Sequence, residues 1–363
     1  MGFYKSFSVL KAAFVGVALL SASMVMASSG GEGGEFNAGE MISHHIADNH
    51  DWHLIDLEGE DGQLHPISIP LPVILWHQGQ GLQIFLSSKF HHGTESYNGY
   101  ALDSHNDVYF TNDDGSINEA ETGKIIDISI TKNVVTMFIV SLLVILIFSG
   151  IARAYKRSPD SAPSGIQSFF EPLILFIRDE IAIAVIGKDK YEKFMPFLLS
   201  VFFFIWFGNM LGLVPFFPGG ANFTGNIAVT MVIAACTLVL ILVNSNKHYW
   251  QHVFAMPGVP IPVLFVLTPI EILGVFLKPI VLMIRLFANI TAGHITILAF
   301  MSLIFIMGKN GEAPVIGWGT GVVSVVLSII MTFLELLVAF LQAFIFTLLS
   351  ATYFAGATEE AHH

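Results

Sequence analysis

The stretch FLKPIVLMIRLFANITAGHITILAFM, residues 276–301, decides how this chain folds. It is apolar enough to lie inside a lipid bilayer, and yet it contains Arg285, Asn289 and His294 near its middle. A charged side chain at the centre of a membrane helix costs about 2.5 kcal/mol or more unless it is paired or hydrated. An arginine at this position therefore predicts a membrane helix whose function depends on that charge.

The whole chain has the composition of an integral membrane protein. Of its 363 residues, 54% are hydrophobic and only 12% are charged, which excludes an ordinary soluble protein. The single cysteine, Cys236, lies within an apolar stretch, so we expect no intrachain disulfide. The sequence contains no G-x-x-x-x-G-K-[ST] phosphate-binding loop, so we expect no ATP hydrolysis by the chain itself.

The first residues have the pattern of an export signal, and we predict a signal peptide over residues 1–27. Lys5 and Lys11 accompany an apolar run from Ala12 to Met26, which small residues follow. The run is short for a membrane span, which favours cleavage near Ala27 over a permanent anchor. Residues from 28 onward are then expected to lie outside the cytoplasm.

Residues 28–125 are predicted to form an acidic, His-rich, extracytoplasmic domain. They contain 16 Asp or Glu residues, only Lys89 and Lys124 as basic residues, and 9 of the 14 histidines. The segments 65–76, 81–88 and 107–116 have the apolar patterns and turn residues of short strands. We therefore expect a small β-rich domain.

Histidine pairs in this domain raise the question of a metal site. The pairs are His44 with His45 and His91 with His92. Their spacings do not repeat and no cysteine accompanies them, so a solvated polar surface is the favoured interpretation. We expect no metal and no cofactor.

The rest of the chain, residues 126–363, is predicted to be an all-α polytopic membrane domain with about five membrane helices. The first span, from Val134 to Ile151, is followed by three basic residues, which places its C-terminal end in the cytoplasm. Residues 165–187 mix charged and apolar side chains and suit an amphipathic helix at the membrane interface. Two further spans cover residues 196–214 and 227–243, and the last two stretches cover 262–307 and 315–355.

The last two stretches are too long to cross a bilayer at right angles. At 1.5 Å per residue each exceeds about 60 Å, roughly twice the hydrocarbon thickness. They must tilt strongly, break, or run partly outside the membrane core. Because only the turn GKNGEAP, residues 308–314, separates them, we expect an antiparallel hairpin.

Charged, histidine and amide side chains within these two stretches are few, and most of them are candidates for a function. They are Glu271, Lys278, Arg285, Asn289, His294, Glu335 and Gln342. Lys278 lies toward the cytoplasmic end, where it can extend to the headgroups, and this simple explanation is favoured for it. Arg285 lies about 20 residues from either end of its stretch, beyond such reach, and arginine keeps its proton.

Helical geometry divides the remaining residues into groups. Asn289 falls close to the face of Arg285, whereas His294 falls nearly opposite and about 13 Å along the axis. Glu335 and Gln342 are seven residues apart and share a face. His294 lies 14 residues before the turn and Glu335 lies 21 residues after it, so only an offset pairing brings them together. A paired histidine and carboxylate suits a proton relay, and the alternative is a structural histidine bonded to a helix carbonyl.

These residues resemble a known family. The segments RLFANITAGH, residues 285–294, and ELLVAFLQAFIFTLLSATYF, residues 335–354, are similar to the two signature helices of subunit a of F-type ATP synthases. NMLGLVP, residues 209–215, and PIEILGVFLKPIVLMIRLF, residues 269–287, fit the same family. The resemblance covers about residues 130–357, and the N-terminal residues 1–125 exceed what the family needs before its first span.

The resemblance implies a stator subunit of the Fo motor that couples proton transport to ATP synthesis. Arg285 would face the carboxylate of each subunit of the rotating c-ring, with Asn289 and Gln342 along the ion path. His294 and Glu335 would form the pair of the outer half-channel, and Glu271 would lie near the cytoplasmic one. Some bacterial members have the acid and the histidine exchanged between the two helices.

The resemblance also implies partners and a location. The partners are a c-ring, the peripheral-stalk subunit b, the F1 sector through the complex, and lipid, with the proton preferred to sodium and no nucleic acid. The location is the bacterial inner membrane, with the C-terminus in the cytoplasm. A self-contained proton channel or secondary transporter would also use an intramembrane Arg, His and Glu, although the spans show no internal repeat. A receptor merely anchored by spans leaves Arg285 unexplained.

Overall fold

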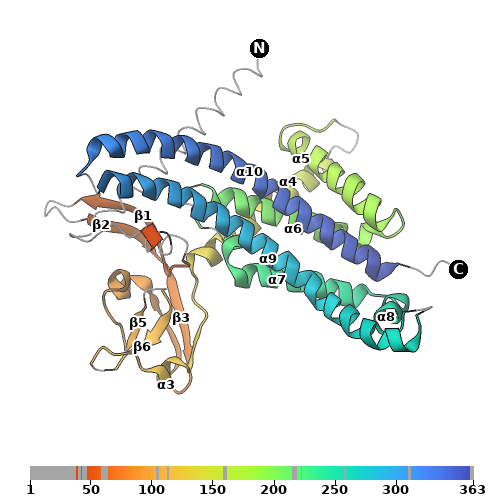
Figure 1. Cartoon of the computed structure of the whole chain (residues 1–363), viewed down its shortest axis with the longest axis horizontal. Helices are drawn as coiled ribbons and strands as arrows, with labels where there is room; N and C mark the ends of the chain where they lie inside the picture. Colours follow the sequence, from red (N-terminus) through yellow and green to blue (C-terminus); the bar gives the residue numbers. More distant parts are fainter. Residues whose placement is uncertain are drawn as a thin grey trace, which may run out of the picture. The chain divides into compact units, whose positions relative to one another are not determined.

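The computed structural model shows a mostly helical chain with a strand-containing N-terminal region (Figure 1). It describes residues 38–39, 42, 47–58, 64–103, 106–112, 114–157, 162–214, 219–221, 223–256, 259–309 and 312–359. The predicted signal peptide, His44 and His45 lie outside these residues. The chain divides into two compact units, one with residues 1–138, 211–223 and 291–336, the other with residues 139–210, 224–290 and 337–363.

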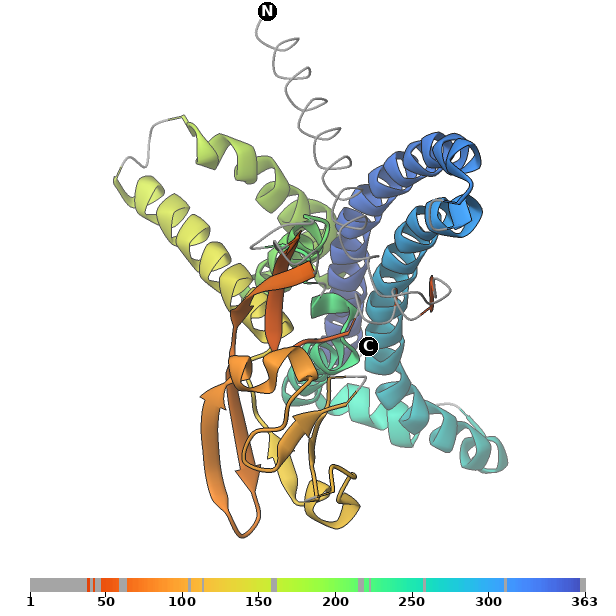
Figure 2. The ribbon, with the colours of Figure 1, turned by 90° about the vertical axis from the view of Figure 1, so that its left-hand side faces the viewer.

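The N-terminal region is built from short antiparallel strands. β1 (Asp51–Glu58) pairs with β2 (Leu64–Pro70), and β5 (Tyr100–Leu102) pairs with β6 (Val108–Phe110). β3 (Pro72–His77) and β4 (Gly81–Leu86) form the orange hairpin of Figure 2, and β7 (Ile125–Asp127) joins β3 to give the order β4-β3-β7. The 3-10 helix η1 (Ser87–Gly93) and the helix α3 (Glu119–Thr122) complete the region.

The single strand predicted over residues 65–76 is wrong, because the structure has two strands there, β2 and β3. They separate at Leu71, which lies between Pro70 and Pro72. Proline has no backbone N–H and cannot continue a strand ladder in both directions. Leu71 instead exchanges hydrogen bonds with Ser87: its N–H donates to Ser87 Oγ at 3.0 Å, and its carbonyl accepts from Ser87 N at 3.0 Å.

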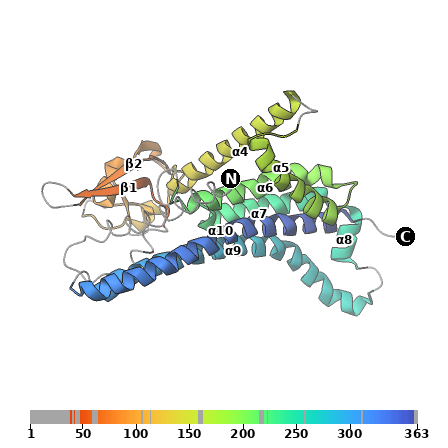
Figure 3. The same ribbon diagram turned by 90° about the horizontal axis from the view of Figure 1, so that it is seen from above.

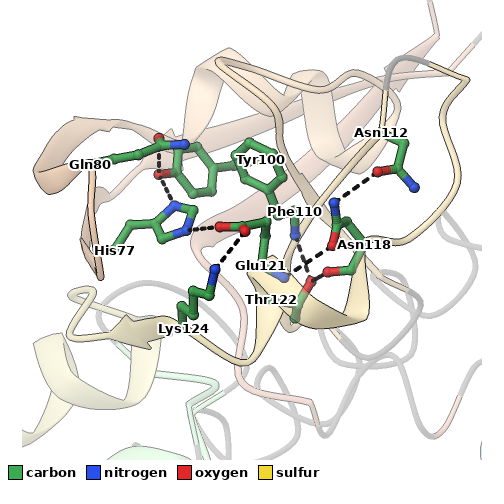
Figure 4. Close-up of polar contacts among 9 residues, drawn as sticks. All are labelled: His77, Gln80, Tyr100, Phe110, Asn112, Asn118, Glu121, Thr122 and Lys124. Carbon is green, nitrogen blue, oxygen red and sulfur yellow. Dashed lines mark hydrogen bonds and ion pairs between the residues drawn. The ribbon is translucent and has the colours of Figure 1, made fainter.

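A buried histidine organises the core of this region (Figure 4). Val73, Leu75, Phe90 and Tyr100 are fully buried between the three-stranded sheet and the segments that follow it. His77 is also fully buried, with Nδ1 2.9 Å from Tyr100 Oη and Nε2 3.1 Å from Glu121 Oε2. These contacts fasten α3 and β5 to β3.

Two carboxylates of this region are held ionised by their partners. The Lys124 ammonium, 2.7 Å away, and then His77 lower the pKa of Glu121 below its usual value. Burial tends to raise the pKa of Asp127, but hydrogen bonds from His50 and Ser129 outweigh it, so the pKa of Asp127 is also lowered. Asp127 lies in β7 and Glu121 lies shortly before it. β7 is the strand that leads into the first long helix.

Five helices of the described residues are long and apolar enough to cross a membrane, as predicted. They are α4 (Lys132–Arg157), α6 (Tyr191–Gly212), α7 (Ile227–Asn244), α9 (Ile261–Gly308) and α10 (Pro314–Thr358). α9 has 48 residues and α10 has 45, about 70 Å each at the helical rise. Both run without interruption, which removes the option of a break, even though α9 contains Pro269 and Pro279. Their tilt in the bilayer stays a prediction.

Shorter helices connect the spans. The segment predicted as one amphipathic helix over residues 165–187 is α5 (Ile166–Phe176) followed by the π-helix η2 (Ile177–Ile186). The connection after α7 contains a further helix, α8 (Lys247–Phe254), which the sequence did not indicate. Figure 3 shows the ribbons of α6 and α10 seen from above. Aromatic pairs join these two helices, with Phe194 stacked on Phe354 at 4.6 Å and Phe202 against Phe340 at 5.7 Å between ring centroids.

Candidate functional site

The two long helices lie side by side and antiparallel (Figures 1 and 2). Next to the turn, a Cβ atom added at Gly308 would lie 3.3 Å from Gly317 Cα, so the two backbones nearly touch. Glycine allows this approach because it has no side chain. Small residues at this point therefore bring the polar side chains of one helix within reach of the other.

His294 of α9 and Glu335 of α10 form a direct pair. His294 Nδ1 lies 2.9 Å from Glu335 Oε1, and the side chains are 20% and 3% exposed. The second carboxylate oxygen, Oε2, is buried and has no hydrogen-bond partner among the described residues. The predicted pairing is geometrically sound, and the offset it needed is present.

Gly293 makes room for this carboxylate. A Cβ atom at Gly293 would lie 2.6 Å from Glu335 Oε1, 3.0 Å from Cδ and 3.1 Å from Cγ. Real Cβ atoms essentially never come so close to another heavy atom, so only glycine fits there without displacing Glu335. The available signal for this role in the sequence was the position of Gly293 directly before His294.

Arg285 lies on the exposed face of α9. Its main-chain carbonyl accepts a hydrogen bond from Gln342 Nε2 at 2.6 Å, and Gln342 is buried. Its side chain is exposed, as are Ala288 and Asn289 on the same face. Among the described residues, the guanidinium forms no ion pair. Its charge lies close enough to α10 to act on Tyr353, on a surface that also exposes Val281 and Ile284.

Two further α9 residues have aromatic neighbours. Glu271 is half-buried and lies near Tyr249 of α8, where burial and then the negative charge of Glu271 raise the pKa of that tyrosine. The Lys278 ammonium lies 5.6 Å from the centre of the Tyr353 ring on α10, a cation–π distance. Lys278 thus has a contact inside its own unit in addition to any contact with headgroups.

The sequence analysis missed a buried polar pair behind α10. Thr224 Oγ1 donates to Asn209 Oδ1 at 2.6 Å, and Asn209 Nδ2 donates to the carbonyl of Ala339 at 3.3 Å. Both side chains are buried. The signal was present, because Asn209 is an uncharged polar residue near the end of an otherwise apolar span. Its contacts position the part of α10 that lies between Glu335 and Gln342.

Of the predicted histidine pairs, only His91 with His92 lies within the residues that the structure describes. No group of three or more His, Cys, Asp or Glu residues there could hold an ion. His91 Nε2 lies 3.6 Å from Glu95 Oε2 on the surface.

Comparison with known proteins gives one family match for the membrane region and one for the N-terminal region. Residues 134–355 match the ATP synthase A chain family, and residues 41–128 match a family described as a domain of unknown function. A protein of Chlorobium phaeobacteroides named ATP synthase subunit a is 44% identical over 244 residues, 65% of this chain and 67% of that protein. One of Myxococcus xanthus with the same name is 41% identical over 246 residues, 66% of this chain and 76% of that protein. The first match covers more than half of the chain, which therefore belongs to the ATP synthase A chain family.

Proposed function

We propose that this multi-pass membrane protein is the Fo stator that lines two proton half-channels and presents Arg285 to a rotating c-ring. The observation that carries the proposal is the exposed guanidinium of Arg285 on an apolar helix face. A permanent charge on such a face needs an anionic partner from outside the chain. A carboxylate on each c-ring subunit has the required chemistry.

The outer half-channel is assigned to His294 and Glu335. Their 2.9 Å contact places two titratable side chains next to each other, so that a proton can pass between them. Histidine is the side chain that changes charge near neutral pH, which suits it to passing a proton to a carboxylate. Protons rather than sodium ions are therefore the proposed cargo.

The inner half-channel is assigned to the neighbourhood of Glu271. Glu271 lies on the same helix as Arg285, 14 residues before it, and its charge acts on Tyr249 of α8. A c-ring carboxylate that has circled the ring would release its proton into an aqueous path near this residue. The ring moves because a neutral carboxylic acid tolerates lipid whereas an ionised one does not.

Arg285 would separate the two half-channels. Two unit charges 4 Å apart attract by about 4 kcal/mol at an effective dielectric constant of 20, enough to favour an ionised c-ring carboxylate. The same positive charge repels a proton that approaches without the rotor. Each proton crossing 100 mV delivers about 2.3 kcal/mol, and a leak past Arg285 would dissipate it.

The proposed assembly includes the c-ring, the peripheral-stalk subunit b and, through the complex, the F1 sector. The proposed location is the bacterial inner membrane, with residues 28–125 outside the cytoplasm and the C-terminus inside. The basic residues at the C-terminal end of α4 support this orientation, because basic residues collect on the cytoplasmic side of spans.

The test compares two cations of the same helix. Membranes with Arg285→Ala are expected to lose proton-driven ATP synthesis and ATP-driven proton pumping, whereas Lys278→Ala membranes keep both. Native gels and mass spectrometry of the purified complex must show that the c-ring, subunit b and F1 are present in both variants. Synthesis retained by Arg285→Ala would refute the proposal. Transport by this chain alone in liposomes, with no c-ring bound, would instead support a channel or transporter.

A further inference from the structure

The three-stranded sheet of the N-terminal region has a second apolar face that its own domain does not cover. Cross-strand neighbours on this face form three rows. The rows are Trp76 with Leu82 and Ile126, Ile74 with Ile84 and Ile128, and Pro72 with Leu86 and Ile130. We call these nine residues the outer sheet face.

The outer sheet face is exposed although every residue on it is apolar. Six of its side chains have exposed fractions between 47% for Trp76 and 65% for Ile84. The opposite face carries Val73 and Leu75, which are fully buried in the domain core. A sheet that is apolar on both faces normally has both faces covered, and large exposed apolar patches mark interaction sites.

The charge distribution of the domain indicates which kind of partner covers the outer sheet face. Residues 28–125 contain 16 acidic residues, yet none of the nine positions on the outer sheet face is charged or polar. A basic protein partner would use the acidic side chains of the domain. An uncharged face rich in isoleucine and leucine, with a tryptophan at one end, has the composition that enters the interface of a lipid bilayer.

The outer sheet face also continues into a membrane helix. Ile130, in the third row, is two residues before Lys132, where α4 begins. At 3.3 Å per residue the third row is about 7 Å along the chain from α4, and the first row about 20 Å. The face therefore starts where the chain enters the membrane.

The junction between the sheet and α4 is held by several hydrogen bonds rather than by a loose linker. Asp48 accepts from Thr131 Oγ1 at 2.8 Å and from Asn133 N at 3.2 Å. The N–H of Lys132 donates to the carbonyl of Asn49 at 3.0 Å, and His50 Nε2 lies 3.0 Å from Asp127 Oδ2. These contacts fix β7 relative to the first turn of α4 within one compact unit.

We propose that the outer sheet face docks on the surface of the lipid bilayer beside the N-terminal end of α4. The strands β3, β4 and β7 then lie along the headgroup layer, with the isoleucine and leucine side chains inserted and the core face turned away. Docking fixes the N-terminal domain next to the first span. It is independent of how Arg285 and the proton path work.

The test is a spin-label accessibility measurement on the complete ATP synthase in lipid nanodiscs. A nitroxide is attached at Ile84→Cys in a Cys236→Ala background, and the matched control carries it at Glu119→Cys, an exposed position of α3 in the same domain. At position 84 we expect collisions with oxygen, which concentrates in lipid, to exceed those with a water-soluble nickel chelate several-fold. At position 119 the nickel chelate should dominate.

Two other patterns at position 84 would overturn the proposal. Dominance of the nickel chelate, as at position 119, would mean that the face is open to water. Low accessibility to both reagents would mean that a protein covers it, either a second copy of this chain or another subunit. A second measurement places the label at Ile126→Cys and adds the double substitution Ile84→Glu with Ile128→Glu. The label should then collide more with the nickel chelate than with oxygen, while the complex stays assembled. Unchanged dominance of oxygen would also contradict docking on lipid.

Discussion

Replacing Gly293 with alanine should disable the His294–Glu335 pair without disturbing the helix that carries it. The added Cβ would lie 2.6 Å from Glu335 Oε1, whereas ordinary contacts begin at 3.4 Å. The carboxylate must therefore shift by about 0.8 Å, which is enough to stretch a 2.9 Å bond beyond the hydrogen-bonding range. Glu335 is buried on the neighbouring helix, so it has little space in which to restore the contact.

The expected effect follows from the strength of that contact. A hydrogen bond to a charged group contributes about 1.5–3 kcal/mol, and each 1.36 kcal/mol corresponds to a factor of about 10 in rate. If the pair relays protons, proton-driven ATP synthesis should fall about 10-fold to 100-fold. The assay is ATP synthesis by inverted membrane vesicles under an imposed proton gradient, normalised to the amount of assembled complex.

A matched glycine on the same helix gives the control. A Cβ atom at Gly274 would meet nothing within 4 Å, so Gly274→Ala should keep full activity, since alanine favours the helix by about 1 kcal/mol over glycine. Adding Glu335→Asp to Gly293→Ala shortens the carboxylate side chain by about 1.5 Å and should recover part of the lost activity. Activity of Gly293→Ala within twofold of the unaltered protein would refute the reasoning.

Two further predictions concern the N-terminal domain. His77→Ala removes both ring contacts of a fully buried side chain and should destabilise the domain by about 2–4 kcal/mol, measured as earlier proteolysis of this domain on heating the intact complex; unchanged resistance would contradict the role assigned to His77. The pKa values of Glu121 and Asp127 are lowered in the folded state. Both carboxylates therefore stabilise the fold at pH values above their unfolded pKa values, which are about 4, and this stabilisation is lost as the pH falls through the folded pKa values. Proteolysis of the domain between pH 6 and pH 3 should show this loss of stability, and the loss should be smaller in Asp127→Asn. The same pH profile of proteolysis in Asp127→Asn and in the unaltered protein would count against the role assigned to Asp127.

The sequence predicted the faces of the helices well, because apolar periodicity is a local property of each segment. All five spans are present, and Glu335 and Gln342 share a buried face as their seven-residue spacing indicated. The strands were harder, because β5 and β7 have only three residues each and exist through their partners. β7 pairs with β3, about 50 residues earlier in the chain. The three residues of β7, IID, contain no pattern that predicts this pairing.

The register of α9 against α10 decides whether the candidate site exists, and periodicity alone could not supply it. Counting from the turn, His294 and Glu335 are mismatched by seven residues, about two helical turns. Glycine contacts accompany the offset that the structure adopts. Gly308 against Gly317 sets the approach of the backbones near the turn, and Gly293 receives the Glu335 carboxylate about four turns further along α9. In the other unit, the hydrogen bond from Gln342 to the carbonyl of Arg285 has the same register. Alanine at Gly308 or Gly317 would push the backbones apart or shift their register, and a register shift of one residue turns a side chain by about 100°, whereas alanine at Gly293 would displace the Glu335 carboxylate directly. The carboxylate would then leave its histidine, so the small residues of this hairpin are as necessary to the proposed proton relay as the residues that titrate.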